Sequence, residues 1–262
     1  MSAIVLQNEV VHYEVLGRGR PVIFLHGWVG SWRYWIPAMQ TVSVTFRAYA
    51  LDFWGFGDTA KQPNRYLIGQ QVALLENFLK EMGIGKVALI GHGMGAVVGL
   101  ILTSLHTDQV DRLMAVSLPV KSSQIADRLR SDSPSTLAEW LLGRLPTSEA
   151  ARVEAPKADP LAITTFLNDL EFLDLGEIIQ HSKTPCLFIH GQNDPAVTLP
   201  ESDSMGELPE TAHFIEFEGS GHFPMLDETE KFNRLVTDFY SLDSGESPRQ
   251  LQLKEAWKRR MR

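Results

Sequence analysis

The sequence predicts an α/β fold in which a mostly parallel sheet carries helices on both faces and an inserted helical cap. Short apolar runs alternate with amphipathic helical patterns along most of the chain, which is the pattern of strands separated by helices. This alternation stops over residues 120–183. With 262 residues, 44% of them hydrophobic, the chain can bury a large core and is neither disordered nor fibrous.

Seven short apolar or alternating runs predict strands, and four longer patterns predict helices between or after them. Because helices separate most of the strands, we expect mainly parallel pairing, with an antiparallel start allowed at the N-terminal hairpin. The strands are expected at residues 10–16, 21–26, 46–52, 86–91, 111–118, 184–190 and 212–217, and the helices at residues 32–42, 67–82, 94–105 and 229–240.

The stretch from residue 120 to residue 183 shows no strand pattern but contains helical patterns at residues 135–145 and 160–175. An insertion of this length in an α/β sequence is typical of a cap that lies over the sheet and shapes a substrate pocket. We therefore expect four parts: a first core segment (1–119), the helical cap (120–183), a second core segment (184–242) and a basic C-terminal tail (243–262).

The net charge of -8 argues against nucleic acid as a partner. The exception is residues 247–262, which hold six basic residues against Glu255 and place Leu253, Trp257 and Met261 four residues apart. This pattern favours peripheral contact with an anionic membrane surface or an acidic protein. The alternative is a helix folded back on the acidic body, or a frayed end.

The remaining composition predicts a cytoplasmic protein. Residues 1–11 lack the basic and apolar regions of a secretory leader. Cys186 is the single cysteine, so no disulfide can form within the chain. The most apolar stretch, residues 87–102, is interrupted by His92 and is shorter than the roughly 20 residues that a bilayer span requires.

Polar and glycine-rich motifs follow five of the expected strands. In open α/β sheets the chemistry lies at the carboxyl ends of the strands, so these motifs are expected to meet at one edge. They are His26-Gly-Trp28, Asp52-Phe-Trp-Gly-Phe-Gly57, Gly91-His-Gly-Met-Gly95, Gly191-Gln-Asn-Asp194 and Gly219-Ser-Gly-His222.

The order of these motifs resembles that of the α/β-hydrolase superfamily, and the resemblance covers residues 10–240. That family carries a nucleophile in a G-x-S-x-G elbow, followed along the chain by an acid and a histidine. The resemblance implies that Gly93 stands at the nucleophile position, with Asp194 as the acid and His222 as the base. It also implies that the backbone N–H groups of Trp28 and Met94 form an oxyanion hole.

Gly93 departs from the family pattern because it offers no hydroxyl for covalent attack. Loss of a nucleophilic serine costs roughly 10⁶-fold in turnover, or about 8 kcal/mol of barrier. Ser31, Asp52 and Cys186 are conceivable substitute nucleophiles. Each also has a structural explanation, because Ser31 can cap a helix, Asp52 can form a turn and Cys186 lies at the start of a strand. Gly93 is compatible with a natural loss and with a substitution made to trap a ligand. We expect Gly93→Ser to lower stability and raise esterase activity.

Residues near the expected site suggest a small apolar organic substrate or ligand. His26, Trp32, Trp54 and Phe223 come from loops at the same edge and are predicted to line the pocket. The alternative is that these rings pack in the core and that His26 supports its loop. No metal-ligand spacing and no phosphate-binding glycine loop is present, so we expect no metal and no cofactor.

Three functions follow from these residues. The first is a hydrolase for an ester, thioester, amide or C–C bond that is impaired at Gly93. The second is a non-catalytic protein that binds a ligand or partner. The third uses His222 and Asp194 for general-base catalysis without a covalent nucleophile, as the family's cofactor-free oxygenases and lyases imply.

Overall fold

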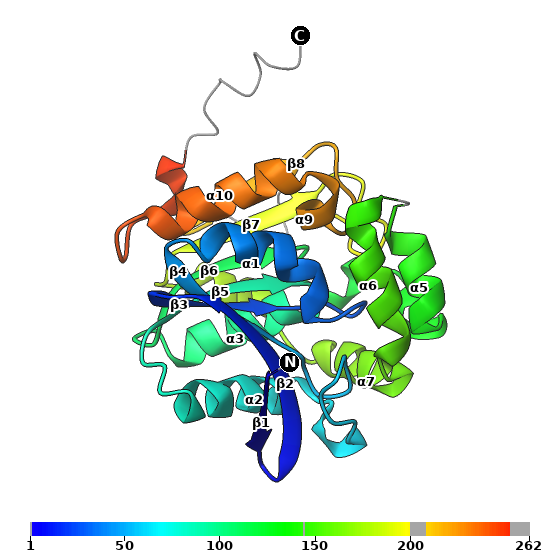
Figure 1. The fold of residues 1–262 in the computed structure, drawn as a ribbon. Helices are drawn as coiled ribbons and strands as arrows, with labels where there is room; N and C mark the ends of the chain where they lie inside the picture. Colours follow the sequence, from blue (N-terminus) through cyan, green and yellow to red (C-terminus); the bar gives the residue numbers. More distant parts are fainter. Residues whose placement is uncertain (1, 144, 200–207, 252–262) are drawn as a thin grey trace.

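The computed structural model describes residues 2–143, 145–199 and 208–251, which form a sheet of eight strands flanked by helices (Figure 1). The strand order is β1-β2-β4-β3-β5-β6-β7-β8. Strands β1, β2 and β4 pair antiparallel, and all other neighbours pair parallel. This arrangement confirms the predicted α/β class. The strands are β1 (Ser2–Leu6), β2 (Glu9–Gly17), β3 (Arg20–Leu25), β4 (Phe46–Leu51), β5 (Val87–His92), β6 (Val110–Val116), β7 (Cys186–Gly191) and β8 (Ala212–Phe217).

Helices cover both faces of the sheet. Helices α1 and α10 pack together on one face, and α2 and α3 pack together on the other (Figure 1). Strands β3, β5 and β7 are almost entirely buried because helices lie above and below them. These helices are α1 (Ile36–Val42), α2 (Ile68–Glu81), α3 (Met94–Leu105) and α10 (Thr229–Ser241), with the shorter η1 (Trp32–Trp35), η2 (Pro63–Arg65), α9 (Pro224–Asp227) and η6 (Pro248–Gln250).

The chain between β6 and β7 is helical and lies at one end of the sheet, where Figure 1 shows α5, α6 and α7 together. Helix α8 instead packs against α3. Two hydrogen bonds tie α7 to the core: Tyr66 Oη donates to Asp159 Oδ2 (2.7 Å), and Ile68 N donates to Asp169 Oδ2 (2.8 Å). The elements are η3 (Ser122–Gln124), α4 (Arg128–Ser131), α5 (Pro134–Leu141), η4 (Pro146–Ser148), α6 (Glu149–Glu154), η5 (Ala155–Lys157), α7 (Pro160–Leu170) and α8 (Leu175–Gln180).

A buried carboxylate also joins this insertion to the core. Glu154 of α6 accepts a hydrogen bond from Ser31 Oγ (3.1 Å) and lies 2.8 Å from Arg33 Nε. Lys157 bridges Glu154 (3.1 Å) and Asp58 (2.9 Å). Glu154 is 2% exposed, so these partners replace the contacts that water would otherwise make with its carboxylate.

The structure corrects the sequence prediction in several places. Strand β1 was not predicted; it joins β2 through Gln7 and Asn8, whose φ values of 51° and 67° fit a tight hairpin turn. The helix expected at residues 32–42 begins as the 3₁₀ turn η1. The helix expected at residues 160–175 ends at Leu170, and α8 begins at Leu175.

The basic tail is described only as far as residue 251. Pro248–Gln250 forms a 3₁₀ turn, and Arg249 donates to the carbonyl groups of Leu208 and Ala212. The remaining residues of the tail, including Leu253, Trp257 and Met261, lie outside the described residues. Among the helices of the described residues, none combines the length and apolar composition needed to span a bilayer.

Candidate active site

A buried acid–histidine pair lies at the carboxyl ends of β7 and β8. Asp194 follows β7 and His222 follows β8, and His222 Nδ1 lies 2.8 Å from Asp194 Oδ2. The second oxygen, Oδ1, accepts the backbone N–H groups of Ala196 (2.8 Å) and Val197 (3.0 Å). Because the carboxylate accepts from Nδ1–H, the neutral imidazole keeps Nε2 free of a proton, as a general base requires.

The environment keeps Asp194 ionised. Burial alone raises its pKa, but the charge and hydrogen bond of His222 and the N–H of Val197 together lower the pKa from 3.8 to about 2. His190 Nε2 lies 3.7 Å from the same carboxylate and donates to the carbonyl of Val197 (2.9 Å). The Asp194 carboxylate therefore stays negatively charged at neutral pH and lies next to Nδ1 of the His222 ring.

Gly93 occupies the sharp turn between β5 and α3. Its φ of 49° and ψ of -110° lie in a region that residues with a side chain rarely adopt. The flanking glycines permit close backbone approach: a Cβ on Gly91 would lie 2.3 Å from the carbonyl oxygen of Gly95, and a Cβ on Gly95 would lie 2.4 Å from that of Leu25. The backbone at Gly93 thus makes the sharp, tightly packed strand-to-helix turn that was expected at the nucleophile position.

The indole of Trp28 lies where the side chain of a residue at position 93 would begin. A Cβ built on Gly93 would meet Trp28 Cζ3 at 2.8 Å and Cε3 at 3.0 Å. The Trp28 ring lies nearly parallel to that of His222, with centroids 6.1 Å apart and an interplanar angle of 16°. The indole also contacts the ring of Phe166 of α7, so it lies between the dyad and the helical insertion.

A chain of hydrogen bonds fixes the backbone of His222. Gly27 N donates to Tyr34 Oη (2.6 Å), and Tyr34 Oη lies 3.0 Å from His92 Nδ1. His92 Nε2 donates to the carbonyl of His222 (2.8 Å), which also accepts Ser117 Oγ (3.2 Å). Burial holds the pKa of His92 well below its usual value, so this imidazole stays neutral and Nδ1 accepts the Tyr34 proton.

The two predicted oxyanion donors come from residues that adjoin Gly93: Met94 follows it in the chain, and the ring of Trp28 lies against it. Met94 is the first residue of α3, so its N–H has no acceptor within the helix and lies at the positive end of the helix dipole. Trp28 follows β3, and its backbone N–H has no hydrogen-bond partner among the described residues. Both residues are fully buried.

The structure brings one of the four predicted pocket residues, Phe223, against the dyad. Its ring lies edge-on to that of His222, with centroids 5.3 Å apart. His26 instead supports its loop, because Nδ1 donates to Gly27 O and Nε2 accepts Phe53 N. Trp32 and Trp54 contact His12 and Arg65 respectively, and within the described residues neither makes a ring contact with His222.

The three conceivable substitute nucleophiles lie in other networks. Ser31 Oγ donates to Glu154, and Asp52 Oδ2 lies 2.9 Å from His12 Nδ1. Cys186 begins β7, at the end of the strand away from Asp194, and burial raises the pKa of its thiol to about 11. Among the described residues, none of the three is hydrogen-bonded to His222. The part of the chain that the structure describes contains no cluster of three metal-ligating side chains.

Sequence reasoning missed Tyr34, Ser117 and Phe166. Tyr34 lies within a predicted helix, where its apolar neighbours gave no sign of a buried hydroxyl in a hydrogen-bond chain. Ser117 directly follows β6 and has a positive φ of 48°, a backbone conformation that its sequence context does not predict. Phe166 belongs to the amphipathic pattern of α7, which indicates burial but not its partner.

Comparison with known proteins gives a family match. A family model described as the alpha/beta hydrolase fold matches residues 20–161. Two relatives align along most of their lengths. A pimeloyl-[acyl-carrier protein] methyl ester esterase of Vibrio cholerae is 24% identical, covering 87% of this chain and 97% of the esterase. A 2-hydroxy-6-oxo-6-(2'-aminophenyl)hexa-2,4-dienoic acid hydrolase of Metapseudomonas resinovorans is 26% identical, covering 87% of each chain.

The solved structures share the fold. The enol-lactonase from Burkholderia xenovorans LB400 superposes with a TM-score of 0.80 at 18% identity, covering 92% of this chain and 100% of the lactonase. The similarity therefore extends over the sheet and the helical insertion alike.

Proposed function

This chain belongs to the α/β-hydrolase fold family, and from that premise we propose that it is a hydrolase-type protein whose covalent route is impaired at Gly93. Its substrate or ligand would be a small apolar organic molecule with an ester, thioester, amide or C–C bond of the type that hydrolases cleave. The relatives named above act on an ester and on a dienoic acid, which supports a small-molecule substrate.

The proposal is supported by the buried Asp194–His222 hydrogen bond and by the sharp turn at Gly93, where the family pattern would place a nucleophile. Asp194 and His222 are hydrogen-bonded and buried, and Gly93 keeps the strained elbow backbone at φ 49°. A serine at that turn would pass its proton to His222 Nε2 while attacking a carbonyl carbon. Glycine cannot form that bond, so no acyl-enzyme intermediate can form at position 93 even though the His222 base is present.

Two further features support a ligand with an oxygen acceptor. The N–H groups of Trp28 and Met94 would stabilise negative charge on a carbonyl oxygen. The indole N–H of Trp28 is buried and has no hydrogen-bond partner among the described residues. Leaving such a group unsatisfied costs about 1–3 kcal/mol, which an acceptor on a bound molecule would offset.

General-base catalysis without a covalent intermediate is the second candidate, and the orientation of His222 favours it. Asp194 fixes the ring so that Nε2 can take a proton from water or from an acidic carbon of the ligand. This route uses only groups that the chain possesses. A protein that binds its ligand without turnover would use the same contacts but would not depend on the His222 base.

The test introduces a serine hydroxyl at position 93. We would assay p-nitrophenyl acetate hydrolysis and fluorophosphonate labelling in the wild type, Gly93→Ser, Gly93→Ala and the double variant Gly93→Ser with Trp28→Leu. The leucine removes the indole atoms that a side chain at position 93 would meet, while its backbone N–H remains. Gly93→Ala is the matched control because it adds the same Cβ without a hydroxyl.

We expect labelling and hydrolysis in the double variant and weaker activity in Gly93→Ser, with none in Gly93→Ala. Adding His222→Ala to the active variant should abolish turnover. If neither serine variant is labelled while both remain folded, the impaired-hydrolase proposal fails. Turnover by the unmodified chain that disappears in His222→Ala would favour general-base catalysis instead.

A further inference from the structure

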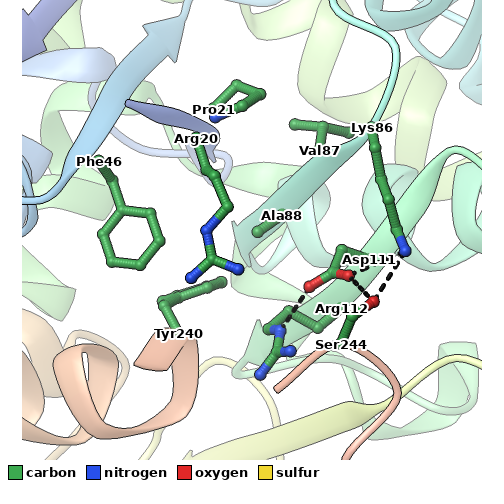
Figure 2. A pocket seen from close by; sticks show the side chains of 10 residues that line it. All are labelled: Arg20, Pro21, Phe46, Lys86, Val87, Ala88, Asp111, Arg112, Tyr240 and Ser244. Atoms are coloured by element: carbon green, nitrogen blue, oxygen red, sulfur yellow. Dashed lines mark hydrogen bonds and ion pairs between the residues drawn. The ribbon is translucent and has the colours of Figure 1, made fainter. Parts of the chain in front are cut away.

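A cavity lies at the edge of the sheet opposite the dyad, where the parallel strands begin. Its volume is about 220 Å³, and its walls come from the starts of β3, β4, β5 and β6 and from the end of α10 (Figure 2). The Asp194–His222 dyad follows the carboxyl ends of strands, so this cavity is separate from the candidate active site.

Much of the wall is apolar and aromatic. Phe46 and Tyr240 are buried, and their rings meet edge to face with centroids 6.2 Å apart. Pro21, Val87 and Ala88 complete the apolar surface. A cavity of about 150 Å³ lined by apolar side chains is large enough for benzene, so this one has room for a single ring with a small substituent.

The charged lining residues divide into a cluster joined by hydrogen bonds and ion pairs and one cation that has no ion-pair partner among the described residues. Asp111 lies 2.8 Å from Arg112 Nε and 3.2 Å from Lys86 Nζ, and it accepts the Ser244 hydroxyl. Arg112 also donates to two backbone carbonyl groups. Figure 2 shows these four side chains joined on one side of the cavity.

Arg20 lies apart from that cluster. Its guanidinium is 5.3 Å from the centroid of the Phe46 ring, and among the described residues it has no carboxylate partner. In Figure 2 its side chain points into the cavity between Phe46 and the Asp111 cluster. Three cations and one carboxylate therefore line this cavity in a protein whose net charge is -8.

We propose that this cavity binds a small organic anion, a single apolar ring bearing a carboxylate. The ring would pack against Phe46 and Tyr240, and the carboxylate would accept two hydrogen bonds from the Arg20 guanidinium, whose planar fork matches a carboxylate. Asp111 does not compete for Arg20, because Arg112, Lys86 and Ser244 already surround it. This inference is independent of the function proposed for the dyad.

Benzoate is the probe that tests the proposal, with benzamide as its uncharged counterpart. Binding would be measured by calorimetry on the full chain and mapped by backbone amide shifts in NMR spectra. Arg20→Gln removes the proposed anion partner. Arg18→Gln is the matched control, since Arg18 is an exposed arginine two residues before Arg20 that does not line the cavity.

We expect benzoate to shift amides of Phe46, Tyr240 and their neighbours, and to bind at least tenfold more tightly than benzamide. Arg20→Gln should weaken benzoate binding at least tenfold, and Arg18→Gln should leave it unchanged. The proposal is overturned if Arg20→Gln binds benzoate as the wild type does, or if benzoate shifts only residues around Trp28 and His222. Absence of benzoate binding up to tens of millimolar would also overturn it.

Discussion

Replacing Gly93 by serine tests both the strain at the elbow and the chemistry of the site. The φ of 49° and ψ of -110° at this position cost a residue with a side chain about 1–3 kcal/mol. The new Cβ would also lie 2.8 Å from Trp28 Cζ3, so the indole must move by several tenths of an ångström. For a chain of this length, 1 kcal/mol corresponds to roughly 2–4 °C in Tm. We therefore expect Gly93→Ser to lower Tm by about 2–12 °C.

The assay is differential scanning calorimetry of the wild type, Gly93→Ser and Gly93→Ala at one pH and protein concentration. Both variants should lose similar stability, because strain and the Trp28 contact depend on Cβ and not on the hydroxyl. Adding Trp28→Leu should then cost less in Gly93→Ser than in the wild type, because in the variant the indole is already displaced. If both single variants had a Tm equal to or higher than that of the wild type, the strain argument would be refuted.

Three further predictions concern buried polar groups. Since the folded-state pKa of Asp194 is lowered to about 2 from 3.8, its stabilisation is present above pH 4 and is lost as the pH falls toward 2. Asp194→Asn should accordingly cost about 2 kcal/mol at pH 7, and urea titrations should show this gap narrowing below pH 4; a gap that stays constant would contradict the assignment. Glu154→Gln should cost about 1–3 kcal/mol in urea unfolding by breaking contacts with Arg33, whereas the exposed Glu149→Gln on the same helix should change stability by less than about 0.5 kcal/mol; equal losses would count against the buried cluster. Burial and a pKa of about 11 should keep Cys186 unreactive toward a thiol reagent at pH 8 until urea unfolds the chain, so rapid labelling of the native protein would disprove its burial.

Much of the fold could be predicted from the sequence because local signals and tertiary structure agree. The buried parallel strands are short apolar runs, and α3 and α10 begin where the periodic patterns begin. The motifs around Gly93, Asp194 and His222 each follow a strand, and parallel strands deliver their carboxyl ends to one edge. Strand β1 was missed because its positive-φ turn at Gln7 and Asn8 contains no glycine.

The finer arrangement of the site depends on contacts between distant residues, which periodicity does not reveal. Nothing in the motif around Trp28 indicates that its indole covers Gly93 and lies parallel to His222. His26 matched a pocket residue by position, yet its two ring nitrogens are engaged by backbone groups. Trp32 and Trp54 lie at the same edge of the sheet as the dyad, but their rings contact His12 and Arg65 respectively.

The placement of the dyad on the last two strands has a consequence for biosynthesis. A nascent chain that ends before β7 already contains the elbow and the helical insertion, but neither Asp194 nor His222. In such a product the edge of β6 that pairs with β7 is left open, and unpaired strand edges recruit other chains into aggregates. Truncation after residue 183 should therefore yield insoluble material, because β6 gains its neighbour only when β7 has been made, and the dyad is complete only after β8.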